Sequence, residues 1–348
     1  MSHPLIRALV DRLVGGLIVL CVSVAAVPVL VLFLFVLING LPGMLTPGFF
    51  SDPPYPQGVP GGGVLNAIIG TFEIVGIGSL LAVPVGALIG IFLSEYGRNQ
   101  IGNIVRFISD VFTGLPSIAF GIFGYTVVVL TTHHFSAVSA SVALAVLMLP
   151  VILRATETAL VLVPNSLREA GLALGAPRWR VTLEIVVPAA LGGIVTGALL
   201  AMARAAGETA PLLFTAFGND IIQTNPLQPM GALSLTIFRN ALVPYPNLQQ
   251  QAWGAALLLV ALVAATNILA RIDVRRIQRR APRAEDPQRR GARVAVLGVR
   301  HDHQLVVAGE GVDRGGVLVP VEHPRLAAAR GQPELAAVVG GPADLDWL

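Results

Sequence analysis

Arg204 and Glu208 are the only charged residues between Ile185 and Phe217. A charged side chain costs at least about 2.5 kcal/mol at the centre of a membrane helix, so it usually faces a bundle interior or a wet cavity. Four residues apart on a helix, the two side chains would share one face and could pair. A guanidinium also binds oxyanions through paired donors. Because Arg before Glu is the less favoured order for a helical pair, a purely structural pair is an unusual choice here.

The composition indicates that these two charges lie in a membrane. The chain has 348 residues, of which 54% are hydrophobic and 12% charged, whereas about 25% of the residues in soluble domains are charged. The arginines group beside apolar runs, where they orient helices, so nucleic acid is not an expected partner. The single cysteine, Cys21, excludes an intrachain disulfide and metal-type cysteine spacing.

Six apolar runs are long enough to cross about 30 Å of hydrocarbon as helices. They cover residues 13–38, 64–93, 111–130, 137–153, 189–210 and 253–272. The first run is too long for a cleaved signal peptide, and residues 1–12 precede it as a cytoplasmic N-terminus. Arginine is concentrated in every second connecting segment, so the positive-inside rule predicts that both termini and the second and fourth loops are cytoplasmic. The Pro- and Gly-rich segment 39–63 is then an external loop.

The fourth loop has the composition of a folded element. Ser166 and Glu169 have the spacing of a capping box, which predicts a short helix over residues 167–174. Gly175 stops this helix, and a second helix begins after Pro177 and returns the chain to the membrane. The loop is therefore expected to form a compact pair of short helices on the cytoplasmic face.

The same loop resembles the EAA loop of permease subunits in bacterial binding-protein-dependent ABC importers. The resemblance is carried by Arg168, Glu169, Ala170, Gly171, Gly175, Ile185 and Pro188, within an EAA segment of residues 165–188. Gly171 departs from the usual Ala, and Val187 from the usual Leu. The resemblance implies an all-α integral membrane fold with six transmembrane helices over residues 13–277. It also implies that these residues couple the permease to an ATP-binding subunit.

Four further stretches resemble the phosphate-specific branch of that family, the PstA permeases. They are FLSEYGR (92–98), GLPSIAFGIFGYTVVV (114–129), LVPNSLREAGLALGAPRW (162–179) and ARAAGETAPLLFTAF (203–217). The resemblance implies translocation of inorganic phosphate across the cytoplasmic membrane. The implied partners are a homologous permease (PstC-like), a pair of ATP-binding subunits (PstB-like) and an external phosphate-binding protein (PstS-like). No cofactor and no enzymatic activity are expected, and the sequence holds no GxxxxGK[ST] phosphate-binding loop.

Phosphate as substrate favours Arg204 and Glu208 as a pathway or gate, because Glu208 competes with the anion and keeps its contact with Arg204 reversible. A helix-packing pair stays open as the alternative. So do importers of sulfate, molybdate or an amino acid, and a proton-driven transporter that would use Glu208 or Glu73 as its proton site. Glu73 is otherwise expected at the external interface. Residues 278–348 lie outside the resemblance and are expected to be disordered or to arise from a frameshift.

Overall fold

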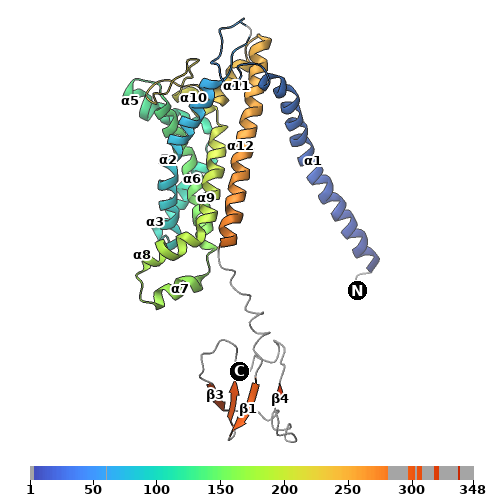
Figure 1. The fold of residues 1–348 in the computed structure, drawn as a ribbon, viewed down its shortest axis with the longest axis vertical. Helices are drawn as coiled ribbons and strands as arrows, with labels where there is room; N and C mark the ends of the chain where they lie inside the picture. The colour runs from blue at the N-terminus through green and yellow to red at the C-terminus, as the bar shows by residue number, and fades with distance from the viewer. Residues whose placement is uncertain are drawn as a thin grey trace. The chain divides into compact units, whose positions relative to one another are not determined.

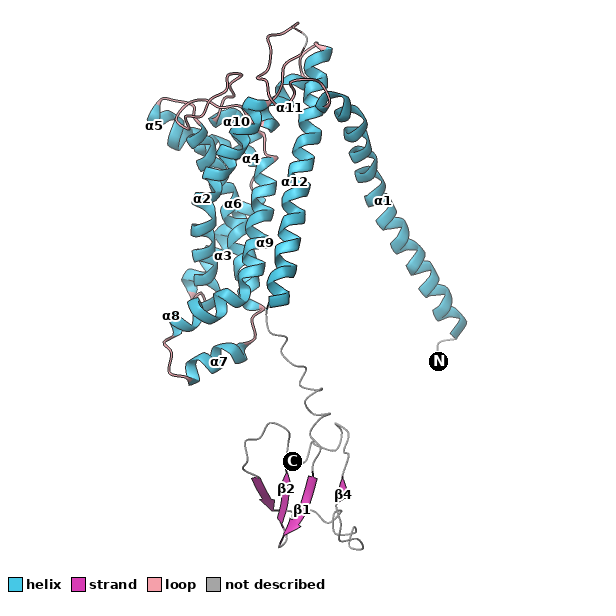
Figure 2. Cartoon of the chain, viewed as in Figure 1, coloured by secondary structure: helices cyan, strands magenta, loops and turns pink. Residues whose placement is uncertain are grey.

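The computed structural model describes residues 4–59 and 61–280, together with four short strands near the C-terminus. The chain divides into two compact units, Met1–Gln278 and Arg279–Leu348. The first unit is helical and the second contains the strands (Figures 1 and 2). We describe each unit by itself.

The helical unit consists of long membrane-spanning helices and shorter connecting helices (Figure 1). Five helices are long and apolar enough to cross a membrane, and a bent pair of helices brings the number of candidate spans to six. The predicted number of spans therefore agrees with the structure. The elements are α1 (Pro4–Met44), α2 (Leu65–Glu95), α3 (Gln100–Gly114), α4 (Ser117–Gly124), the π-helix Tyr125–Val129, α5 (Leu130–Thr132), α6 (Ala137–Val161), α7 (Asn165–Ala173), α8 (Arg178–Val181), the π-helix Thr182–Val186, α9 (Val187–Ala206), α10 (Ala210–Thr215), α11 (Leu233–Ala241) and α12 (Pro246–Arg280).

The third span is broken, and the expectation of one continuous helix over residues 111–130 is wrong. The segments Gln100–Gly114 and Ser117–Thr132 meet at an angle of 104°. Leu115 has extended backbone angles, φ −71° and ψ 141°, because a proline disfavours helical geometry in the residue before it and Pro116 follows. The third span therefore consists of two helical arms, Gln100–Gly114 and Ser117–Thr132, and not of one continuous transmembrane helix.

The fifth span ends earlier than the sequence suggests. A continuous helical segment runs from Arg178 to Ala206, and Gly207 forms its C-cap. The expected helix over residues 189–210 is therefore wrong at both ends: it begins at Arg178, so the expected second short helix of the loop is the start of this span, and it stops at Ala206, before α10 begins at Ala210. Glu208 consequently lies in a turn between two helices and not on α9.

Small residues bring the central helices close together. On α2, a Cβ at Gly86 would lie 2.9 Å from Cγ2 of Ile152, and a Cβ at Gly90 would lie 2.6 Å from Cβ of Thr156. On α9, a Cβ at Gly197 would lie 2.2 Å from Cβ of Ala155. α2 and α9 thus pack against α6, and the main buried cluster forms between them around Leu144, Met148 and Ile152. Gly193 and Gly197 of α9 accordingly serve packing within this chain.

The second unit contains a small antiparallel sheet of order β3-β2-β1-β4. Its strands are β1 (Leu297–His301), β2 (Gln304–Val307), β3 (Val317–Pro320) and β4 (Ala336–Ala337). Val299 pairs with Val306, and Leu305 pairs with Val319. The other residues after Arg280 lie outside the described part of the chain, so the predicted disorder of 278–348 stays a prediction.

Candidate pathway and coupling sites

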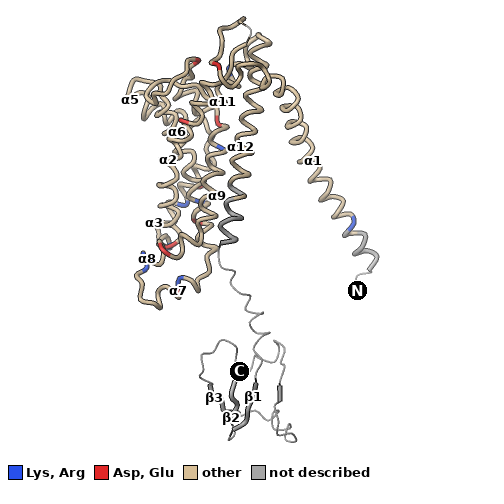
Figure 3. Tube along the Cα trace, in the orientation of Figure 1, with Lys and Arg blue, Asp and Glu red and all other residues tan. Residues whose placement is uncertain are grey.

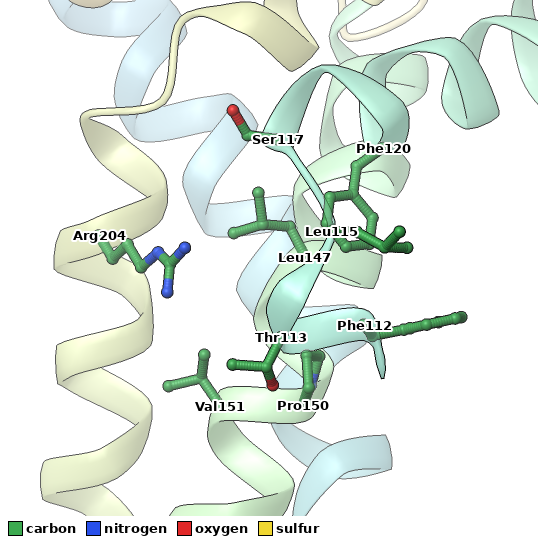
Figure 4. Close-up of a pocket in the computed structure, with 9 residues that line it drawn as sticks. All are labelled: Phe112, Thr113, Leu115, Ser117, Phe120, Leu147, Pro150, Val151 and Arg204. Atoms are coloured by element: carbon green, nitrogen blue, oxygen red, sulfur yellow. The ribbon is translucent and has the colours of Figure 1, made fainter. Parts of the chain in front are cut away.

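Arg204 lies in the last turn of α9 and faces the break in the third span. Its guanidinium points from α9 toward Ser117, Leu147 and Thr113 (Figure 4). A cavity at this point is lined by Phe112, Thr113, Leu115, Ser117, Phe120, Leu147, Pro150, Val151 and Arg204. Its volume is about 10 Å³, which is the space of roughly one water molecule. A polyatomic oxyanion does not fit within this cavity.

Glu208 approaches Arg204 from the turn after α9. Nε of Arg204 and Oε1 of Glu208 are 3.6 Å apart, and the two side chains are 54% and 18% exposed. The inferred pairing is therefore present, but the inference that both residues share one helix face is wrong because Gly207 ends the helix first. The carbonyl of Glu208 accepts a 3.0 Å hydrogen bond from Oγ of Ser234. Residue 208 is thus tied to α11, whereas Arg204 belongs to α9.

Arg106 on the third span and Arg154 on the fourth make several side-chain hydrogen bonds each, unlike Arg204. Arg106 donates to Oε1 of Glu157 at 2.7 Å and to the carbonyls of Leu93 and Gly97, both at 2.9 Å. Arg154 donates to Oε2 of Glu157 at 3.1 Å and also pairs with Asp110. The side chain of Arg204, by contrast, makes no hydrogen bond with any part of the chain that the structure describes and has only the 3.6 Å ion pair with Glu208. Its guanidinium is therefore the one of these three that is free to bind another group.

One charged cluster, made of Arg106, Asp110, Arg154 and Glu157, was not predicted from the sequence. The predicted fourth span stopped at residue 153, whereas α6 continues to Val161. The predicted span ended at the residue before Arg154, because a charge usually marks the end of an apolar run. The helix continues past this charge because a neighbouring helix supplies charged partners, so its predicted length was too short. The signal available in the sequence was the i,i+3 spacing of Arg154 and Glu157 beyond that run.

The short helix after α6 confirms the predicted stop at Gly175. Gly175 has φ +81°, and its N–H donates to the carbonyl of Leu172 at 2.9 Å. The N–H of Ala176 donates to the carbonyl of Gly171 at 3.3 Å. These two bonds form a Schellman motif, in which a residue of positive φ satisfies the last carbonyls of a helix. The two short helices α7 and α8 are thereby set at one end of the bundle (Figure 1).

The predicted capping box at Ser166 and Glu169 is wrong. Pro164 is the N-cap of α7, and no side chain caps this helix. The helix already begins at Asn165, so Ser166 lies within its first turn and both its side chain and that of Glu169 are exposed. Glu169 is therefore available at the surface of the loop.

The other residues of the EAA segment divide into two groups. Arg168, Gly171 and Ile185 face inward, while Ala170 and Pro188 are exposed. A Cβ at Gly171 would lie 2.8 Å from Cδ1 of Ile185 and 2.9 Å from Cγ2 of Val181, so glycine permits the close packing of α7 against the start of the fifth span. Their role in coupling to an ATP-binding subunit stays a prediction.

Glu73 lies on α2, half-buried, nine positions after Val64, the N-cap of this helix. It forms no ion pair or side-chain hydrogen bond with the described residues. The structure brings it into neither the Arg204 cavity nor the cluster around Glu157.

Broken and continuous apolar helices around a buried core, with a pair of short helices at one end, define a multi-span membrane transport subunit. The family described as "Binding-protein-dependent transport system inner membrane component" matches residues 82–281. The chain belongs to this family. It is therefore a permease subunit of an ABC-type transport system, located in the inner membrane.

Curated relatives are similar over most of their length. A protein of Yersinia pestis named "Phosphate transport system permease protein PstA" is 43% identical over 235 residues, which cover 67% of this chain and 79% of the relative. Its namesake in Haemophilus influenzae is 43% identical over 241 residues, covering 69% of this chain and 85% of the relative. A "Probable phosphate transport system permease protein PstA" of Methanocaldococcus jannaschii is 33% identical over 269 residues, covering 76% and 94%.

A solved structure supports the fold. An inward-facing structure of the MetNI methionine ABC transporter matches with a TM-score of 0.51 and 21% identity, over 62% of this chain and 97% of that chain. At this identity the likeness concerns the fold alone.

Proposed function

We propose that this chain is the membrane permease subunit of an ATP-driven importer of inorganic phosphate. The names of the relatives support phosphate as the substrate. The observation that carries the proposal is Arg204, whose guanidinium is half-exposed, lacks a hydrogen bond within the described chain and faces a cavity between α9, α6 and the break in the third span. A guanidinium in that place lowers the electrostatic barrier to an anion.

Glu208 gives this contact a means of release. At 3.6 Å from Arg204 it is near enough to neutralise the guanidinium, but the separation exceeds that of a strong ion-pair hydrogen bond. Phosphate that reaches Arg204 displaces Glu208, and the return of Glu208 displaces phosphate. Because Glu208 is anchored to α11 through Ser234, a shift of α11 against α9 changes the distance between the two charges. Arg204 and Glu208 then act as a gate that opens when these helices separate.

The orientation follows from charge. Arginines lie toward the end of the bundle that carries α7 and α8 (Figure 3), and the positive-inside rule assigns such an end to the cytoplasm. Both termini are then cytoplasmic. The exposed surface of α7, α8 and the start of α9, with Glu169, Ala170 and Pro188, faces a pair of ATP-binding subunits (PstB-like). ATP is hydrolysed there and not in this chain. A homologous permease (PstC-like) completes the pathway, and an external binding protein (PstS-like) delivers phosphate.

The test is uptake in vesicles rebuilt with the complete set of partners. Vesicles with this chain should accumulate labelled phosphate when ATP and loaded binding protein are supplied, and vesicles without it should not. Sulfate, molybdate and methionine serve as competing substrates in the same assay. Uptake of one of these in place of phosphate would overturn the proposed substrate, and uptake driven by a proton gradient without ATP would overturn the proposed energy source.

A further inference from the structure

Arg168 lies on α7, but its side chain points back into the bundle. It is 19% exposed, and its partner Glu95 is 13% exposed. The two residues that follow it, Glu169 and Ala170, are exposed. Arg168 therefore faces the rest of this chain and not the exposed surface of the loop.

The guanidinium of Arg168 reaches acceptors on α2, on α6 and in the segment just after α6. It donates to Oε1 of Glu95 at 2.8 Å, to the carbonyl of Leu160 at 2.9 Å and to the carbonyl of Val163 at 2.7 Å. Glu95 is the last residue of α2, and Leu160 belongs to the last turn of α6. The last carbonyls of a helix lack partners within the helix, so Arg168 caps α6 and binds the end of α2 at the same time.

The contact of α7 with the fifth span is of a different kind. Gly171 packs on Val181 and Ile185 through apolar groups, and such contacts are non-directional. The contact with α2 and α6 consists of charge-assisted hydrogen bonds from a planar group, which are directional. A displacement of α7 therefore transfers to α2 and α6 through fixed bond geometry.

We propose that Arg168 is a positioning residue that makes α7 and the cytoplasmic ends of α2 and α6 move as one unit. This inference rests on the proposed function, since it assumes that ATP binding to a partner displaces α7. Arg168 acts from inside the subunit and does not form part of the surface that meets the ATP-binding subunit. Its loss therefore leaves that surface intact and disconnects it from the spans.

The first test measures phosphate transported per ATP hydrolysed in the full complex. Arg168→Gln should lower this ratio about tenfold, a usual size for coupling between sites, while the complex still assembles and hydrolyses ATP. Arg168→Lys should give a ratio between those of Arg168→Gln and the unmodified protein. An ammonium keeps the charge toward Glu95 but lacks the planar guanidinium that reaches all three acceptors. Arg98→Gln is the matched control, since Arg98 is exposed at the same end of α2. A normal ratio in Arg168→Gln would overturn the proposal.

The second test measures movement. Spin labels at Leu174→Cys and Tyr96→Cys, both exposed positions on either side of the Arg168 contact, are placed in a Cys21→Ser background. Their separation should stay the same with and without ATP when Arg168 is present, and should change on ATP addition in Arg168→Gln. A separation that changes with ATP in the presence of Arg168 would overturn the proposal. A broader distribution of spin-label distances in Arg168→Gln that is equal with and without ATP would also overturn the proposal. It would indicate that Arg168 has a purely structural role.

The two tests separate this inference from the proposed substrate. A complex with unmodified Arg168 that hydrolyses ATP without moving phosphate would overturn phosphate as substrate. The spin-label distances need only ATP, so they would still decide the role of Arg168.

Discussion

Arg106 on α3 and Glu157 on α6 form a 2.7 Å ion pair in which the two side chains are 27% and 12% exposed. Arg154 binds the other oxygen of Glu157, so one buried carboxylate holds two guanidinium groups. Arg204 and Glu208, at 3.6 Å, form a looser pair with the arginine more than half exposed. Similar charges thus serve a tight structural junction in one place and an open contact in the other.

Removing the carboxylate of Glu157 should destabilise the protein without affecting the transport step. Glu157→Ala leaves two guanidinium groups without their shared acceptor, and breaking a buried pair in this way costs about 3 kcal/mol. The thermal unfolding midpoint in detergent should fall, and less subunit should reach the membrane. Uptake per assembled subunit should stay near that of the unmodified protein.

The matched control for Glu157 is Glu184→Ala. Glu184 pairs with Arg180 at 3.4 Å, and the two side chains are 64% and 53% exposed, so its loss should cost less than about 1 kcal/mol. Equal losses of stability in the two variants would show that the Glu157 cluster does not hold α3 to α6.

Substitutions at Gly175 should be tolerated when the new residue readily adopts a positive φ, whatever the size of its side chain. Its φ is +81° and nothing lies within 4 Å of a Cβ placed there. The left-handed conformation costs an ordinary residue about 1–2 kcal/mol, whereas asparagine adopts it more readily. Gly175→Asn should therefore keep most uptake per ATP, and Gly175→Val should lose it while the subunit stays in the membrane. The reverse order would contradict the role of the positive φ in setting α7 and α8.

The sequence could predict the number of spans because each is a long apolar run with at most two charged residues, and it could predict the stop at Gly175 because Pro177 follows this glycine two residues later. It could not predict the break at Leu115 and Pro116. Pro84 and Pro150 also follow apolar residues, yet each lies inside a continuous helix. Whether a proline breaks a span depends on whether the surrounding helices satisfy the freed backbone groups, which is a tertiary property.

The C-terminal end of α9 and the direction of the Arg168 side chain could not be predicted from the sequence for similar reasons. Gly193 and Gly197 lie within α9, while Gly207 ends it, so glycine alone does not mark the end of a membrane helix. Arg168 binds Glu95, which lies 73 residues away in the sequence. Nothing in the local pattern of the loop distinguishes an arginine that faces a partner from one that faces its own bundle.

Gly171 should accept alanine only with a compensating change in its neighbour. A Cβ at this position would lie 2.8 Å from Cδ1 of Ile185, the mobile end of its side chain. Gly171→Ala should lower uptake per ATP modestly, and Ile185→Val in the same chain should restore it in part, because the Cδ1 methyl group is removed while Cγ2 of Val181 stays 2.9 Å from the added Cβ. Gly171→Leu should abolish coupling in either background. Coupling that is equal in Gly171→Ala and Gly171→Leu would show that close packing of α7 on the fifth span is not required.

Membrane orientation can be tested with single cysteines in a Cys21→Ser background. Pro56 and Arg178 are both exposed, and the charge pattern assigns them to opposite sides of the membrane. Pro56→Cys should react with an impermeant thiol reagent in intact cells, and Arg178→Cys should react only after the membrane is opened. Reaction of Arg178→Cys in intact cells would reverse the proposed orientation.

Arg204→Gln should abolish or strongly reduce phosphate uptake while the subunit still assembles. Glutamine keeps polarity and much of the side-chain length but loses the charge that attracts the anion, and the half-exposed arginine holds no hydrogen bond within the described chain that its loss would break. Glu208→Gln should also impair transport, because Arg204 then lacks the competitor that releases phosphate. The double variant should be as inactive as Arg204→Gln alone, since Glu208 acts only through Arg204.

A packing role for Arg204 and Glu208 would give the opposite pattern. Each single change would then strand a charge and reduce the amount of assembled complex, and neutralising both would restore it. The deciding quantity is uptake per assembled complex, measured for both single variants and the double. Arg239→Gln is the control, because Arg239 belongs to an exposed pair with Asp220 at 3.2 Å, whose loss has little effect on stability. Transport at the normal rate in the double variant would show that the pair only holds helices together and that the anion crosses elsewhere.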